Sequence, residues 1–435
     1  MYKVAELFCG CGGFSFGFEM SGRFETVLGV DIKHEALKTF SYNHIGNPIS
    51  INKDIREIDN DEIIESLKLK GVGVGDLDCL IGGPPCQGFS QMRRDGKRDS
   101  SKVASYSGYN KLLADERNDL ILRFLEIAEV LMPKFVVIEN VKQIRNHVLN
   151  GKAGGFISAV EEILGALGYD VHHQVINAAD YGVPQLRERA IIIASRIGHA
   201  SFPVPDHSES PSHLFKPWVT VSSALSDLPK PSVGKDALGG EGLNLYARKP
   251  TCEYQTLMRD GQVTFPYNHI TRKYSNAIIN IIKEMPQGAN WDEISSKKQE
   301  EYEQLLSNAL DPRSREEKYN EFVQSGQINP VFYKRYYWSA YTRLSEEKPA
   351  LTITANANFL GSGRFTHPIE NRGITAREAA RLQSFPDSFK FITDKNDTTK
   401  TEKNGIAIDM IGEAVPPVLA MKIALHIARE LDSNK

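Results

Sequence analysis

The feature that most constrains this chain is the alternation, over its first 200 residues, of short apolar runs with longer amphipathic stretches. Residues 3–8, 26–30 and 135–138 each fit a buried strand, and residues 120–131 repeat apolar side chains at helical spacing. Strand, helix and strand follow one another at least five times. This repetition predicts an α/β fold with a doubly wound, mostly parallel sheet.

Side chains suited to binding or chemistry directly follow several of the predicted strands. These candidates are Phe8, Asp31, Asp54, Cys86 and Glu139. The carboxyl ends of parallel strands meet at one edge of a sheet, and open α/β sheets bind their ligands at that edge. The sequence therefore predicts one composite site there.

The stretch around Cys86 reads Ile-Gly-Gly-Pro-Pro-Cys-Gln-Gly-Phe-Ser from residue 81. Pro84 and Pro85 cannot donate to a sheet ladder, so they end the preceding strand and fix the backbone just before the thiol. The polar run over residues 87–109 predicts a movable lid. A rigidly held thiol beside a lid indicates covalent catalysis, whereas a buried thiol in a tight turn is the ordinary alternative for a single cysteine.

Composition argues against several other classes of protein. No apolar run is long enough for a membrane span, and the first residues lead directly into a strand, so no signal peptide is expected. Five cysteines, an odd number, argue against a disulfide framework and for a reducing, cytoplasmic compartment. Cys9 and Cys11 form a C-x-C pair without a second pair or a histidine cluster in the sequence, so no metal site is expected.

The formal net charge of −3 does not indicate nucleic-acid binding, but the distribution of charge matters more than its total. Basic clusters occur at residues 93–98, 187–196, 272–273 and 334–335. Each cluster alone is typical of a solvated face. Aromatic side chains over residues 333–338 surround the last cluster, which favours a DNA-binding surface there.

The stretch Pro84-Pro85-Cys86-Gln87-Gly88-Phe89-Ser90 resembles the cysteine motif of the cytosine-5 DNA methyltransferases. Other stretches resemble further motifs of that family, in its usual order and at both ends of the chain. These stretches are residues 8–17, 115–120, 135–141, 181–189, 343–354, 375–387 and 411–417. The resemblance implies a Rossmann-like methyltransferase fold with a second, smaller target-recognition domain, and an enzyme of the prokaryotic restriction-modification type.

The resemblance also implies S-adenosylmethionine as the cofactor, with the glycine-rich turn at residues 9–17 wrapped around it. That turn fails as a dinucleotide fingerprint, because Ser15 stands where G-x-G-x-x-G from Gly10 requires glycine. The cofactor-binding residues implied by the family pattern are Phe8, Gly10, Gly12, Gly13, Asp31, Ile32, Asp54, Ile55, Pro84, Leu120, Glu413 and Val415. The residues alone leave open that Asp31 caps the helix that follows it.

In such a family the Cys86 thiolate adds to carbon 6 of a flipped-out cytosine, and Glu139 supplies a proton at ring nitrogen 3. Carbon 5 then takes the methyl group and loses its own proton, and Cys86 is expelled. A carboxylate that follows four apolar residues is partly desolvated, which favours proton donation. A helix cap is the ordinary alternative for Glu139.

Arg187 and Arg189 belong to a Gln-x-Arg-x-Arg element and would face the same side of an extended segment. The resemblance counts both among the catalytic residues, since the element supports Glu139 and contacts the target base and its phosphate. Ion pairs with Glu188 are the alternative. The other DNA-binding residues implied are Gln87, Ser90, Arg93 and Arg94.

Three regions are expected along the chain: a catalytic and cofactor-binding domain over 1–200, a target-recognition domain over 201–345, and a segment over 346–435. The last segment supports recognition and returns to the catalytic domain as a closing helix. Residues 201–217, rich in Ser, Pro and His, fit a linker, and residues 297–320 fit a charged helix. The expected partner is double-stranded DNA, bound by a monomer, and a separately encoded restriction endonuclease is a candidate second partner.

Other functions stay open from the sequence. The same chemistry can act on RNA such as tRNA. A DNA-binding module without catalysis would not need the intact set of Cys86, Glu139, Arg187 and Arg189. A redox role for Cys86 would need a resolving cysteine, and none is close in sequence.

The closing motif departs from the family at Glu413, where Asn is usual. An ionised Glu only accepts hydrogen bonds, and near the cofactor its charge would repel the carboxylate of the methionine moiety. One hypothesis is therefore transfer of a larger, basic group from an analogue without that carboxylate, such as decarboxylated S-adenosylmethionine. The alternative is that Glu413 faces solvent, pairs with a Lys or Arg, or lies at the N-terminus of the closing helix.

Overall fold

The structure, a computed structural model, describes residues 1–85, 119–146, 155–233, 244–260, 264–307, 312–392 and 403–434. Several predicted site residues lie outside these ranges, and so does the lid predicted over 87–109. The residues concerned are Cys86, Gln87, Ser90, Arg93 and Arg94.

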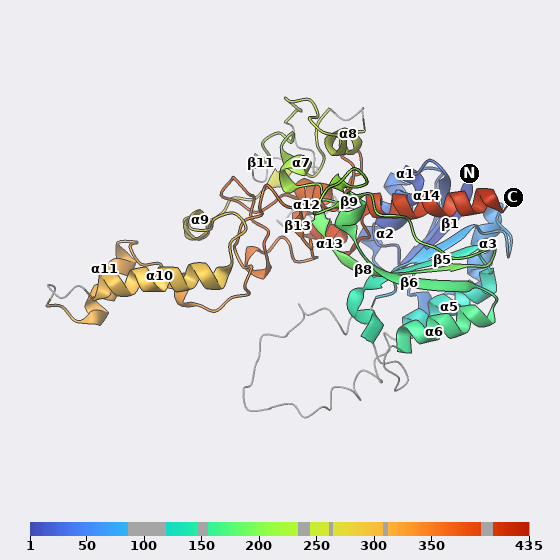
Figure 1. The fold of residues 1–435 in the computed structure, drawn as a ribbon, viewed down its shortest axis with the longest axis horizontal. Coiled ribbons are helices and arrows are strands. Elements are labelled where there is room, and N and C mark those ends of the chain that lie inside the picture. The colour runs from blue at the N-terminus through green and yellow to red at the C-terminus, as the bar shows by residue number, and fades with distance from the viewer. Residues whose placement is uncertain are drawn as a thin grey trace.

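Seven strands form the central sheet, in the order β3-β2-β1-β4-β5-β8-β6 (Figure 1). Their bounds are β1 Tyr2–Leu7, β2 Phe24–Asp31, β3 Ile49–Asn52, β4 Cys79–Gly82, β5 Phe135–Val141, β6 Asp170–Asn177 and β8 Glu188–Ser195. Neighbouring strands are parallel except at β8, which runs antiparallel to both β5 and β6. The predicted doubly wound, mostly parallel sheet is confirmed.

Helices cover both faces of this sheet (Figure 1). The helices of the first layer are α1 (Gly13–Met20) and α14 (Pro417–Ser433), and those of the second are α3 (Asn60–Leu69), α5 (Asp119–Leu131) and α6 (Gly155–Ala166). Side chains of one strand alternate between the two cores, so Ile81 of β4 joins the first and Leu80 the second. The last helix of the chain therefore completes the layer that the first helix begins.

Two predicted elements differ from the structure. The strand predicted over 135–138 continues to Val141, because β8 pairs with β5 as far as Val141 opposite Arg189. The charged stretch 297–320 is not one helix but parts of two, α10 (Trp291–Leu306) and α11 (Arg315–Gln324). A capping box between Ser314 and Glu317 starts the second.

The closing helix begins at the prolines of its motif, as predicted, but another helix ends within the same motif. α13 (Lys403–Glu413) ends within the motif, and α14 begins at Pro417. A proline pair at 416–417 explains the interruption, because proline suits the first turn of a helix but not its interior. Glu413 therefore ends one helix and does not lie in the first turn of the next.

The chain beyond residue 200 contributes to two separate apolar cores. Val221, Tyr254 and Leu382 join the same core as Phe14 of α1. Helices α10 and α11 hold a small core around Trp291 and extend away from the central sheet (Figure 1). Helix α9 joins the two cores, because Ile281 belongs to the small one and Ile282 to the large one. The division at residues 200 and 345 stays a prediction.

The remaining elements are short. The helices are α2 His34–Asn43, α7 Val221–Leu225, α8 Glu253–Arg259, α9 Asn276–Lys283 and α12 Ala376–Leu382. The strands, all in two-stranded pairs, are β7 Gln185–Leu186 with β13 Ala350–Leu351, β9 His207–Ser208 with β10 Lys216–Pro217, and β11 Ser232–Val233 with β12 Ile270–Thr271. Within the described ranges, no helix has both the length and the apolar character needed to cross a membrane.

Candidate active site

The register of the sheet brings the carboxyl ends of its parallel strands together. Leu7 of β1 lies opposite Val30 of β2 and Gly82 of β4, and Gly82 lies opposite Ile138 of β5. The residues that follow these positions therefore share one edge. The strand order reverses between β1 and β4, and a crevice at such a reversal is the usual ligand site of an open α/β sheet.

The turn after β1 is tied to the end of β2 by Asp31. One carboxylate oxygen of Asp31 accepts the N–H of Gly10 (2.7 Å), and the other accepts the N–H of Lys33 (2.7 Å). Burial raises the pKa of Asp31. Because each carboxylate oxygen has two lone pairs, both oxygens can still accept a further hydrogen bond.

The turn itself is shaped by backbone that favours glycine, with Gly12 at φ 87° as the N-cap of α1. Phe8, directly after β1, adopts a φ of 57°, a conformation that is uncommon for a residue with a side chain. A side chain at Gly13 would lie 2.6 Å from the carbonyl oxygen of Val415. The closing segment therefore approaches the turn so closely that only glycine fits.

The next two predicted cofactor residues follow β3. Asp54 caps the 3₁₀ turn η1 (Ile55–Glu57) by accepting the N–H of Arg56 (3.0 Å). The same carboxylate is hydrogen-bonded to the Arg56 guanidinium (2.6 Å), which holds the pKa of Asp54 below its usual value. Ile55 is buried, and Arg123 of α5 donates to its carbonyl (3.3 Å).

The other cofactor candidates vary in exposure. Ile32 is 65% exposed beside Asp31, Leu120 at the start of α5 is half-buried, and Val415 is buried. Glu413 forms an ion pair with Lys33 (2.5 Å), and both side chains are about half exposed. Among the alternatives for Glu413, pairing with a lysine is therefore the one found.

The loop that carries Cys86 leaves β4 beside Glu139. A Cβ built on Gly83 would lie 3.3 Å from the Oε2 atom of Glu139. Asn140 donates its side-chain N–H to the carbonyl of Pro84 (2.8 Å), and both residues are buried. The backbone just before Cys86 is thus held against the end of β5.

Within the described part of the chain, the charged partner of Glu139 is Arg189 on β8. The Nε atom of Arg189 lies 2.7 Å from Oε1 of Glu139, and both side chains are almost fully buried. Burial lowers the pKa of Arg189, and the neighbouring Glu139 opposes that effect. The ion pair fixes the direction of the carboxylate, as expected for an arginine that supports Glu139.

Arg187 makes other hydrogen bonds than Arg189, although it lies close enough to Arg189 and Glu139 for their charges to act on it. Its guanidinium is buried and donates to the carbonyls of Ile353 (3.0 Å), Gly412 (3.1 Å) and Ala414 (3.1 Å). Among the described residues its Nε has no partner, and burial lowers its pKa. The chain at Arg187 passes from the two-stranded β7–β13 sheet into the central sheet, which breaks the alternation of a single strand.

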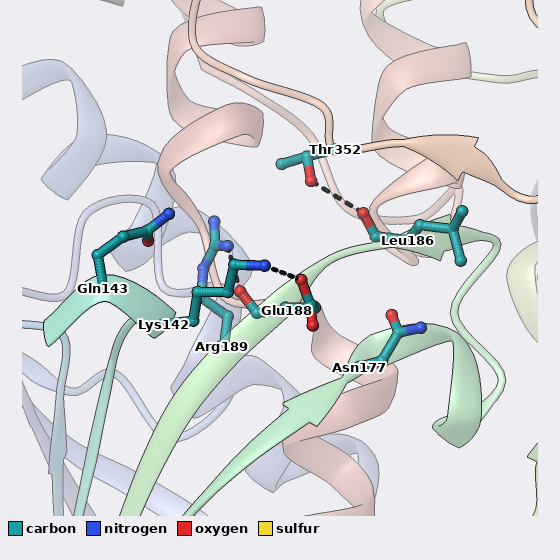
Figure 2. A pocket seen from close by; sticks show the side chains of 7 residues that line it. All are labelled: Lys142, Gln143, Asn177, Leu186, Glu188, Arg189 and Thr352. Atoms are coloured by element: carbon teal, nitrogen blue, oxygen red, sulfur yellow. Dashed lines mark hydrogen bonds and ion pairs between the residues drawn. The ribbon is translucent and has the colours of Figure 1, made fainter. Parts of the chain in front are cut away.

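A cavity of about 440 Å³ opens beside Arg189 (Figure 2). Its lining comes from η3 (Lys142–Asn146), the ends of β6 and β13, and the β7–β8 segment. The lining residues are Lys142, Gln143, Asn177, Leu186, Glu188, Arg189 and Thr352. Lys142 is paired with Glu188, and the hydroxyl of Thr352 donates to the carbonyl of Leu186 (2.8 Å).

Sequence reasoning missed Lys142 and Thr352 as site residues. Lys142 directly follows the Glu-Asn-Val motif, and Thr352 lies in a stretch assigned only a supporting role. With Arg189 they give the cavity two cations and one hydroxyl, a set that suits a phosphate group. Lys142 directly follows one stretch that resembles a family motif and Thr352 lies within another, so these motifs could have indicated both residues.

Comparison with known proteins gives the chain a family. The model of the C-5 cytosine-specific DNA methylases matches residues 2–429. Type II methyltransferase M.DdeI of Desulfomicrobium norvegicum is 32% identical over 429 residues, covering 98% of this chain and 88% of that protein. The chain is also 27% identical to DNA (cytosine-5)-methyltransferase 1 of Gallus gallus, covering 98% of itself and 29% of that longer protein.

A solved structure has the same fold. It belongs to a prophage-encoded protein of E. coli described as a DNA modification methyltransferase. The TM-score is 0.65 at 22% sequence identity, and the match covers 99% of this chain and 100% of that one.

Proposed function

This chain belongs to the family of C-5 cytosine-specific DNA methylases, and from that premise we propose that Cys86 and Glu139 are its catalytic residues. The enzyme is a DNA (cytosine-5)-methyltransferase. The observation that carries the proposal for the site is the position of the Glu139 carboxylate. It lies against Gly83, three residues before Cys86, and is paired with Arg189.

In the proposed reaction Cys86 is the nucleophile and Glu139 is the proton donor. The Cys86 thiolate forms a bond to carbon 6 of the cytosine as Glu139 donates a proton to ring nitrogen 3, so electron density moves to carbon 5. S-adenosylmethionine, when bound, supplies the electrophilic methyl group. Loss of the carbon 5 proton to a base, cleavage of the carbon–sulfur bond and return of the nitrogen 3 proton to Glu139 then restore the neutral ring and release Cys86 as the thiolate.

The edge formed by β1, β2 and β3 fits a nucleoside cofactor such as S-adenosylmethionine. Asp31 can accept from two ribose hydroxyls, because both of its oxygens keep a free lone pair. Ile32 offers an exposed apolar surface beside it, and Ile55 a buried one further along the edge. We propose that the turn from Phe8 to Gly13 carries the methionine end.

The cavity beside Arg189 supports a contact to the DNA backbone. Carbon 6 of a stacked cytosine is out of reach, so the base must leave the duplex and its flanking phosphates must be held. Lys142 and Arg189 offer cations at the cavity. A phosphate that enters would compete with Glu188 for Lys142, and such contacts make DNA affinity fall with salt.

The helical arm formed by α9 to α11 and the segment after it is the candidate recognition element. Tyr337 and Trp338 are exposed, with ring centroids 5.8 Å apart, and the Arg364 guanidinium lies 5.5 Å from the Trp338 ring. Exposed aromatic and basic side chains together suit contacts to bases and phosphates. The neighbouring residues Lys334 and Arg335 are also exposed.

Exchanging residues 291–340 for the corresponding part of another family member is expected to transfer sequence specificity. None of the described residues in this stretch belongs to the core that contains Val221 and Tyr254, whereas Ile278 and Ile282 of α9 contribute to that core and are therefore kept. Bisulfite sequencing of DNA from expressing cells reads the methylated sites. A folded chimera that still methylates the original site would refute the assignment.

Glu413 is expected to leave the product unchanged. Because Glu413 is half exposed and paired with Lys33, its charge is already compensated beside the cofactor edge. The Glu413→Asn variant should make 5-methylcytosine and prefer S-adenosylmethionine, as the wild type does, in nucleoside mass spectrometry with both cofactors offered. Use of decarboxylated S-adenosylmethionine by the wild type, lost in the variant, would support the unusual-cofactor hypothesis instead.

The choice between DNA and RNA as the substrate is tested by nucleoside analysis. Nucleosides from separately purified DNA and RNA of expressing cells should contain added 5-methylcytosine in DNA, and enrichment in tRNA alone would refute a DNA substrate. The monomeric state, the cytosolic location and a partner restriction endonuclease stay predictions. The family relatives named as type II methyltransferases support the last of these.

A further inference from the structure

Three possible metal ligands meet at the edge of the sheet opposite the active site. Asp170 begins β6 and lies opposite Ser195, the last residue of β8. His172 is two residues further along β6, on the same face as Asp170. His199 follows β8, so the antiparallel pairing of the two strands brings it to the same end.

The ligand atoms of these residues converge on one point. His172 Nε2 lies 3.4 Å from one carboxylate oxygen of Asp170, and His199 Nδ1 lies 2.7 Å from the other. All the ligand atoms are within 4.8 Å of one another. A tetrahedral zinc ion with bonds of about 2.0–2.1 Å sets its ligand atoms about 3.3 Å apart, so small movements would suffice.

The carboxylate is fixed independently of the histidines. The N–H of Ala200 donates to Asp170 (2.8 Å). The carboxylate is therefore oriented before any ion arrives. Without a metal, the same geometry places both imidazoles within ion-pair distance of the Asp170 carboxylate.

We propose that Asp170, His172 and His199 bind one divalent transition-metal ion, of which Zn²⁺ is the redox-inert example. Two imidazoles and one carboxylate favour such an ion over Mg²⁺ or Ca²⁺, which prefer oxygen ligands. The fourth position is left for water. The fold creates this site from ligands up to 29 residues apart, whereas the expectation of no metal rested on a cysteine pair without a second pair or a histidine cluster close to it in the sequence.

The position of the site gives the ion a structural role. Ala200 is buried, and the hydroxyl of Ser201 is hydrogen-bonded to His426 of α14 (2.8 Å). A bound ion would therefore join the start of β6 to the point where the chain leaves the central sheet for the rest of the molecule. Binding to the folded state alone raises thermal stability.

The test is a calorimetric titration of Zn²⁺ into tag-free, chelator-treated full-length enzyme, with Mg²⁺ titrated in parallel. We expect one Zn²⁺ per chain, a higher midpoint of thermal unfolding, and no Mg²⁺ binding at this site. His172→Ala and His199→Ala should each weaken Zn²⁺ binding about tenfold or more. His173→Ala is the matched control, because His173 lies next on the strand but is paired with Glu161 (3.2 Å).

Enzyme activity is the folding control, and Zn²⁺ binding decides the proposal. All three histidine variants should retain methyl transfer, because the metal site lies at the other end of the strands from the active site. Retained activity would show that the variants are folded. The absence of stoichiometric Zn²⁺ binding to the wild type would overturn the proposal. Wild-type affinity in His172→Ala and His199→Ala would also overturn it, because the ion would then be held elsewhere.

Discussion

Replacing Cys86 with serine is expected to lower methyl transfer by about four orders of magnitude or more, because a serine hydroxyl is a far weaker nucleophile than a thiolate. Binding of DNA and cofactor should change little. The backbone before residue 86 is held by the Asn140 side chain through the carbonyl of Pro84, and that contact does not involve the thiol. Steady-state transfer of a labelled methyl group measures the loss.

Cys252→Ser is the matched control for this experiment. Cys252 is a free, half-buried cysteine at the start of α8, outside the candidate site. It should keep wild-type turnover, which excludes a general effect of removing a thiol. Near-normal turnover in Cys86→Ser would refute covalent catalysis through Cys86.

Replacing Glu139 with glutamine should lower the rate about 10²- to 10⁴-fold, the range for a lost general acid. The amide keeps the size of the side chain but cannot donate a proton as a carboxylic acid does. It also leaves the buried Arg189 without its charged partner, and breaking a buried ion pair costs about 3–5 kcal/mol of stability. Thermal unfolding must therefore be measured beside the rate.

Glu188→Gln is the matched control, because it removes a nearby negative charge without removing the proposed proton donor. Glu188 lines the same cavity and is paired with Lys142, but it does not contact Glu139 within the described structure. Its substitution should change turnover by only a few-fold. A loss below about tenfold in a folded Glu139→Gln enzyme would reduce Glu139 to a structural role.

The sequence predicted which residues meet at the carboxyl edge of the sheet, because that edge depends on local features. Apolar runs define the strands, and a parallel sheet brings their carboxyl ends together whatever follows in the chain. Asp31 and Glu139 therefore lie at the predicted edge, and Arg189 lies beside Glu139. The identity of the nucleophile rests on sequence alone, since Cys86 lies outside the described residues.

What could not be predicted depends on contacts between distant segments. Arg187 faces the carbonyls of Ile353 and Gly412 because a short strand from the end of the chain pairs beside it, and its spacing from Arg189 contains no sign of this. Thr352 reaches the cavity through the same pairing. His172 and His199 become neighbours only when β6 and β8 pair.

The packing across the predicted boundary at residue 200 could not be predicted either. Residues on both sides of it share one apolar core, which includes Phe14 near the N-terminus and Val221 beyond the predicted linker. Composition detects the change from regular strands to short elements, but it cannot detect that the two regions are packed together. Among the described residues beyond 200, those around Trp291 form a separate core.

The central claim, a covalent bond between Cys86 and the target base, is tested most directly with 5-fluorocytosine. Fluorine cannot leave carbon 5 as a proton does, so the enzyme should remain attached to the DNA after methyl transfer. Duplex DNA carrying the analogue at the site found by bisulfite sequencing is incubated with enzyme and S-adenosylmethionine. We expect a complex that is stable on a denaturing gel, with the DNA mapped to the peptide containing Cys86. An active enzyme that forms no such complex, or forms it at another residue, would rule out covalent catalysis through Cys86.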